Sequence, residues 1–158
     1  MVTVHKPANS NNTEPDLPGG ERRMSATLAR AEAAVADLAR DYATWALADV
    51  AKAGKALAAA KADVAARPTQ VEALFRVAHD LKGQGSSFGY PLVTKIGHSL
   101  CALTRDRVLA YEDKHLELAQ AHVDAIQLVL TKGIKGDGGK VGAELVAKLE
   151  QRVAALVA

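Results

Sequence analysis

The sequence is poor in several features, and each shortage removes a class of protein. Its 158 residues include a single cysteine, Cys101, which excludes an intramolecular disulfide. No cluster of cysteine and histidine has the spacing of a zinc site, and no apolar run is long enough to cross a bilayer. The formal net charge is only +2, which is too close to neutral for a typical nucleic-acid-binding protein.

Aromatic residues are also scarce, at 4% of the chain, and alanine supplies much of the 49% that is hydrophobic. A core of small aliphatic side chains suits closely packed helices better than a β-sandwich, which favours valine, isoleucine, tyrosine and phenylalanine. No segment alternates apolar and polar residues with the period of two that a half-buried strand needs. We therefore expect an all-α protein.

The first residues, MVTVHKPANSNN, lack the apolar stretch of a secretion signal, so we expect a cytoplasmic protein. Residues 1–23 are rich in small, polar and helix-breaking residues and are predicted to be a disordered leader. Residues 24–158 are predicted to form a helical domain with a bundle core at about 41–131. The expected architecture is an up-and-down four-helix bundle with additional N-terminal and C-terminal helices.

The helix boundaries are expected where proline and glycine interrupt the apolar pattern. A long helical stretch from Met24 is expected either to bend or break near Arg40–Asp41 or to overhang the rest as one helix. The later helices are predicted at 70–88, 91–109, 112–131 and after the glycine-rich segment 133–142.

Residues 74–89 (LFRVAHDLKGQGSSFG) are the most informative segment of the chain. Leu74, Ala78, Leu81, Gly85 and Phe88 follow one another at spacings of four and three, the pattern of a helix packed against a bundle. These five residues define the predicted buried seam of the helix.

His79 lies off that seam. At about 100° per residue, it shares a different face of the helix with Phe75, Lys82, Gly83 and Ser86, which lie three, four or seven positions away. We therefore expect the imidazole of His79 on a solvent-facing stripe of a rigid helix.

Two glycines follow the histidine, although glycine costs about 1 kcal/mol relative to alanine in a helix interior. Close packing on the seam explains Gly85, but Gly83 lies one turn beyond His79 on the exposed face. A missing side chain there lets another molecule approach the imidazole, and Lys82 places a cation near the same ring. This arrangement suits a histidine that accepts a phosphoryl group, because the ring nitrogen is a nucleophile and the lysine offsets the new negative charge.

Residues 78–83 (AHDLKG), followed by Gly89 ten positions after the histidine, resemble the signature of histidine-containing phosphotransfer (HPt) domains. The resemblance is close over residues 70–89, looser over about 41–131, and absent from 1–23 and 134–158. It implies a four-helix bundle that accepts a phosphoryl group on one histidine and passes it between aspartates of receiver domains.

The resemblance also implies roles for individual residues. These are His79 as the phosphorylated nucleophile, Lys82 as its charge partner, Phe75, Gly83 and Ser86 as docking residues, and Gly89 as a structural turn. The implied partners are receiver domains of response regulators and of a hybrid histidine kinase, with no nucleic acid and no membrane. The chain would be a phosphocarrier and not an enzyme, a monomer or a dimer, with no cofactor. It departs from the family at residues 84–87 (QGSS), where a small hydroxyl residue or alanine often stands.

Two other interpretations stay open: a helical interaction module without phosphotransfer, and a dimerisation domain related to histidine kinases. A di-metal site in the bundle is not expected, because Glu112-x-x-His115 is the single Glu-x-x-His pair of the sequence. His98 is expected to be half-buried, and His115 and His122 to be solvated or partly packed.

Overall fold

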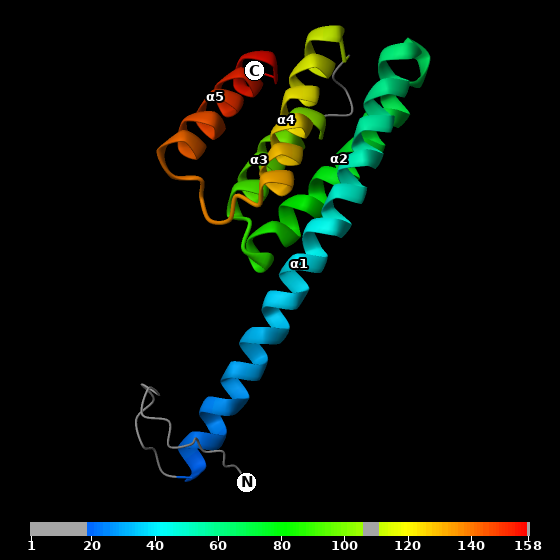
Figure 1. Ribbon diagram of the computed structural model, residues 1–158. Coiled ribbons are helices and arrows are strands. Elements are labelled where there is room, and N and C mark those ends of the chain that lie inside the picture. Colours follow the sequence, from blue (N-terminus) through cyan, green and yellow to red (C-terminus); the bar gives the residue numbers. More distant parts are fainter. Residues whose placement is uncertain (1–18, 106–110, 158) are drawn as a thin grey trace. The chain divides into compact units, whose positions relative to one another are not determined.

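The computed structural model describes residues 19–105 and 111–157, and within these residues it contains helices and no strand. The elements are α1 (Gly19–Ala62), η1 (Val64–Ala66), α2 (Arg67–Gly85), η2 (Ser86–Phe88), α3 (Pro91–Thr104), α4 (Asp113–Lys132) and α5 (Gly139–Val157), where η marks a short 3₁₀ helix (Figure 1). The prediction of an all-α protein is confirmed.

Helix α1 begins five residues before the predicted start at Met24 and continues without interruption through Arg40–Asp41. The chain nevertheless divides at this point into two compact units, one up to Arg40 and one from Asp41 onward. The additional N-terminal helix that we expected is therefore the first part of α1 and not a separate element. The rest of the predicted leader, residues 1–18, lies outside the described residues.

The second unit holds a core of alanine and branched aliphatic side chains. Helix α3 is the most enclosed element, because it packs against α2, α4 and α5 and buries nine of its residues. Helix α5 adds Val146, Leu149 and Val153 to the same core and lies beside α3 and α4 (Figure 1). The C-terminal helix is thus part of the packed bundle, and apolar burial of this kind is the main force that holds helices together.

Local sequence explains most helix ends. Helix α2 begins at Arg67, three residues before the predicted start, because Pro68 fits the first turn of a helix. At Gly89 the backbone has a φ of 89°, in the left-handed region that favours glycine, so this residue ends η2 and turns the chain toward α3. Helix α3 ends at Thr104, earlier than predicted, and residues 106–110 lie outside the described residues.

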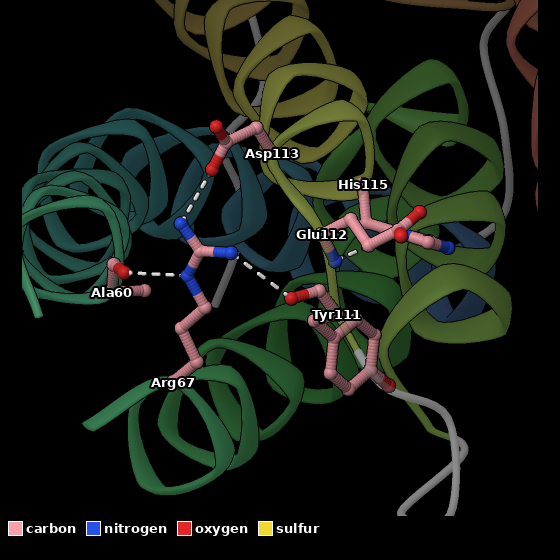
Figure 2. A network of polar contacts seen from close by, with 6 residues as sticks. All are labelled: Ala60, Arg67, Tyr111, Glu112, Asp113 and His115. Atoms are coloured by element: carbon pink, nitrogen blue, oxygen red, sulfur yellow. Dashed lines mark hydrogen bonds and ion pairs between the residues drawn. The ribbon is translucent and has the colours of Figure 1, made fainter. Parts of the chain in front are cut away.

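A buried arginine joins the junction of α1 and α2 to the start of α4. The Arg67 side chain donates from Nε to the carbonyl of Ala60 at 2.9 Å and from one terminal nitrogen to the carbonyl of Tyr111 at 3.1 Å. Its other terminal nitrogen pairs with the carboxylate of Asp113 (Figure 2). Because Ala60 lies in the last turn of α1, the guanidinium also satisfies a carbonyl at a helix end.

The Glu112-x-x-His115 pair forms a helix cap. The Glu112 side chain accepts from the backbone of His115, and the Nδ1 atom of His115 accepts from the Glu112 amide at 3.0 Å (Figure 2). These reciprocal bonds satisfy amides that a helix start leaves free. His115 is buried, against our expectation of a solvated or partly packed ring, and its ring completes this cap.

His122 is also buried, against our expectation of a solvated or partly packed ring. Its Nδ1 atom lies 2.8 Å from the carbonyl of Leu118, and its Nε2 atom lies 2.8 Å from the hydroxyl of Ser99 on α3. Burial lowers the pKa of His122 below its ordinary value of 6.5. The neutral ring therefore donates to Leu118 and accepts from Ser99, and it links α4 to α3 inside the core.

Candidate functional site

The structure bears out the helical register predicted for α2. The seam residues Leu74, Ala78, Leu81 and Gly85 are buried, and Phe88 is half-buried. His79 lies on a different face of the helix from these seam residues and is exposed. The sequence pattern therefore placed the imidazole on the correct face of the helix.

The residues predicted to flank His79 lie on α2 and on the first residue of η2. The Phe75 ring lies one turn before it, half-buried, with its centroid 6.1 Å from the centroid of the imidazole and its plane tilted by 41°. Ser86 lies two turns after it and is exposed. The face thus offers one apolar ring on one side of the histidine and small polar surface on the other.

Gly83 leaves open space one turn beyond His79. A Cβ atom built at this position meets no heavy atom within 4 Å outside its own helix. Packing therefore gives no reason for glycine here, although a helix interior disfavours it. What the missing side chain provides is access to the imidazole from outside.

Lys82 is half-buried beside this opening. Within the part of the chain that the structure describes, no carboxylate lies at ion-pair distance from its ammonium group. The Lys82 charge acts on the buried thiol of Cys101 on α3, where it partly opposes the increase in pKa that burial causes. Among the described residues, the lysine is therefore a cation without an anionic partner, one turn from His79.

Two close contacts fix α2 against α3 below this face. A Cβ atom at Gly85 would lie 2.7 Å from the Thr94 hydroxyl, and one at Gly97 would lie 3.1 Å from the backbone nitrogen of Lys82. Both glycines are buried, so each lets the facing backbone approach where a larger residue would collide. The close packing that we predicted for Gly85 is confirmed. Gly97 was not among the site residues predicted from the sequence, although a glycine inside an apolar helix is a signal of close packing.

The turn at Gly89 is tied to the segment that follows α4. The Gly89 carbonyl accepts from the amide of Gly136 at 3.1 Å, and the Lys135 ammonium lies 6.0 Å from the ring centre of Tyr90. Tyr90 and Phe88 also pack against the Tyr42 ring, with centroids 5.9 Å and 4.9 Å away. This cluster holds the end of α2 in place.

Of the remaining histidines in the described helices, only His98 is exposed, where we expected it to be half-buried. It follows the buried Gly97 on α3. No group of three histidine, cysteine, aspartate or glutamate side chains within residues 19–105 and 111–157 comes together as a metal site. None of the described helices combines the length and the apolar character that crossing a bilayer requires.

Comparison with known proteins gives one match. The family model described as "Hpt domain" matches residues 24–132, which include α2, its exposed histidine and the turn at Gly89. Searches of curated proteins and of solved structures each gave no match. The matched residues end at the last residue of α4, so helix α5 lies outside them although it shares the core.

Proposed function

Because this chain belongs to the Hpt domain family, we propose that it carries a phosphoryl group on His79 between receiver domains of a two-component phosphorelay. Hpt domains take part in histidine phosphotransfer, interact with receiver domains and are phosphocarriers rather than enzymes. The proposal concerns the residue that carries the group, the partners and the direction of transfer.

The observation that supports His79 most directly is its combination of exposure and clearance. The imidazole is exposed on a helix that is fixed against the core. One turn further along the helix, Gly83 has no side chain, and the space that a side chain would fill is open. A group-transfer reaction needs the reacting atoms within about 3–3.5 Å, which a side chain at residue 83 would hinder. His115 and His122 offer no such access, because both are buried.

The proposed step exchanges one bond to phosphorus for another. A ring nitrogen of neutral His79 attacks the phosphorus of an aspartyl phosphate on a receiver domain, and an N–P bond forms. The bond between phosphorus and the aspartate oxygen breaks, and its electron pair leaves with the carboxylate. The nearby Lys82 ammonium offsets negative charge on the phosphoryl group as it arrives. The reverse step delivers the group to the aspartate of a second receiver.

The partners that we propose are the receiver domain of a hybrid histidine kinase and that of a response regulator. Docking would use the half-buried ring of Phe75 and the open backbone at Gly83 on α2, together with the exposed Ser86 at the start of η2. This face combines apolar and small polar surface around the nucleophile, which suits a transient protein interface.

Incubation with a phosphorylated receiver domain tests the proposal. The wild-type protein should acquire label that is labile to acid and stable to alkali, and His79→Gln should acquire none. Because residue 79 is exposed and lies away from the helix ends, this substitution should change the free energy of unfolding by no more than about 0.5 kcal/mol. His98→Gln is the matched control, since it removes the other exposed histidine of the described helices.

Two results would contradict the assignment. Label on His79→Gln at the wild-type rate would place the phosphoryl group elsewhere, and loss of label in His98→Gln alone would move the site to α3. A wild-type protein that takes no label from any receiver would favour a helical interaction module without phosphotransfer.

A further inference from the structure

Gly97 lies in the middle of α3, a position at which glycine weakens a helix. The residue is buried, and a Cβ atom there would lie 3.1 Å from the backbone nitrogen of Lys82 and 3.2 Å from both its Cα and its Cβ. These are the three nearest atoms, and all belong to one residue. Helix α3 therefore rests directly on the backbone of α2 at Lys82.

This contact lies at the base of the Lys82 side chain, so it limits the directions in which that side chain can leave α2. The lysine is half-buried, and its Cβ atom is among the atoms nearest to Gly97. Its charge acts on the Cys101 thiol, and Cys101 lies one turn after Gly97 on α3. At the next residue, a Cβ atom built on Gly83 would meet no heavy atom within 4 Å outside its own helix. The backbone and Cβ atoms of Lys82 thus lie against α3, and the position next to it, residue 83, is open.

We propose that Gly97 is a positioning residue of the phosphotransfer site: it lets α3 support the base of Lys82, and this support fixes the distance from the lysine ammonium to a phosphoryl group on His79. The inference rests on the proposed function. It adds a buried residue on the neighbouring helix, which touches neither the phosphoryl group nor the partner.

The first test compares phosphoryl transfer from a labelled receiver in the wild type, Gly97→Ala, Lys82→Ala and the double variant. Removing the lysine charge should slow transfer by roughly three- to thirty-fold, because an exposed charge pair contributes a modest, salt-screened attraction. Gly97→Ala adds one methyl group that must displace the Lys82 backbone by a few tenths of an ångström. We expect it to slow transfer by about three- to ten-fold.

Two readouts separate positioning from a general effect on the fold. In the Lys82→Ala background, adding Gly97→Ala should change the rate by less than about two-fold, because the group that it positions is gone. The salt dependence of transfer, which in the wild type reflects the lysine charge, should weaken in Gly97→Ala as it does in Lys82→Ala. Gly54→Ala is the control for a glycine-to-alanine change within a helix: unlike Gly97, Gly54 has open space where a Cβ atom would stand, and its substitution should leave the transfer rate unchanged.

A second test needs neither phosphotransfer nor a change at Gly97. If the lysine stem lies along α3, Lys82→Met should raise the pKa of the Cys101 thiol further, as measured from the NMR shift of its Cβ carbon. An unchanged thiol pKa would overturn the inference, and this titration also decides it if Gly97→Ala does not fold.

The outcomes distinguish the two proposals. Equal transfer rates in the wild type and Gly97→Ala, or a slowing that persists in full without the lysine, would overturn the role of Gly97 and leave the proposed function intact. A wild-type protein that accepts no phosphoryl group would contradict the proposed function itself.

Discussion

The four histidines of the described helices differ mainly in what surrounds the ring. His122 is enclosed between α3 and α4 with both nitrogens bonded, and His115 is enclosed at the start of α4, where it completes a cap. His79 and His98 are exposed. Of these four, only His79 combines exposure with an aromatic neighbour, an open backbone one turn away and a nearby lysine that has no ion-pair partner within the described residues. The proposal that His79 is the nucleophile therefore depends on its neighbours.

Substitutions at Gly83 measure how the open space beside His79 affects stability and phosphoryl transfer. Gly83→Ala should stabilise the protein by up to about 1 kcal/mol, because alanine favours a helix and the added methyl group meets no neighbour. Gly83→Gln should also fold, and it should slow phosphoryl transfer far more than Gly83→Ala, since its longer side chain keeps the receiver away from the ring. Chemical denaturation and labelling by a phosphorylated receiver measure the two effects.

The control for this substitution is Gly54→Ala, which should stabilise the protein in the same way without slowing transfer. Wild-type transfer in Gly83→Gln would show that the receiver does not approach over residue 83.

The buried His122 should make the stability of the bundle depend on pH. Burial lowers its pKa in the folded state, so below the ordinary value of 6.5 the unfolded chain binds more protons than the folded one. The contribution of His122 to stability is complete above about pH 6.5 and is lost as the pH falls through that value toward the folded-state pKa. Urea denaturation at about pH 7.5 and 5.5 should therefore show a lower free energy of unfolding at the lower pH.

His122→Leu should be less stable than the wild type at the higher pH and should lose part of this pH dependence. His98→Gln, at an exposed position, should keep the wild-type slope. An unchanged slope in His122→Leu would mean that other groups cause the dependence.

At the scale of secondary-structure elements, one side chain connects three helices. The buried guanidinium of Arg67, at the first residue of α2, bonds to the last turn of α1 and to the residues around the start of α4. The Asp113 carboxylate is largely exposed, so the ion pair itself contributes little. The two bonds to carbonyl groups matter more, because a buried acceptor that loses its partner costs free energy.

Arg67→Ala should therefore lower the free energy of unfolding by about 2–4 kcal/mol, measured by urea denaturation. The control is Arg76→Ala, which removes an arginine of the same helix that is exposed and pairs with Glu72 across one turn. That change should be within about 0.5 kcal/mol. Equal effects of the two substitutions would show that the Arg67 bonds do not stabilise the junction.

At the scale of the whole molecule, the sequence was sufficient for features that depend on neighbouring residues. The apolar spacing from Leu74 to Phe88 predicted which face of α2 is buried, and Pro68 and Gly89 marked the breaks on either side of this helix. It was insufficient where a residue pairs with a distant one. The burial of Arg67 depends on Tyr111 and Asp113, and that of His122 depends on Ser99, none of which a local pattern connects.

The same limit applies to the candidate site. The exposure of His79 and the opening at Gly83 followed from helical geometry alone, since both are properties of α2. The contact of Gly97 with Lys82 belongs to two helices and depends on how they pack. The exposure of Trp45 is a further property that its place in an apolar segment does not reveal.

Helix α2 is anchored at both of its ends, by Arg67 at its start and by the bond from Gly136 to Gly89 just beyond its end. A helix held in this way cannot fray from either side without breaking contacts to other elements. Its central amide protons should therefore exchange with deuterium only when several helices open together, and more slowly than those near the ends of α5. His79 would then lie on one of the least mobile segments of the bundle. The position of its imidazole relative to a partner would depend on rotation about its own two side-chain bonds.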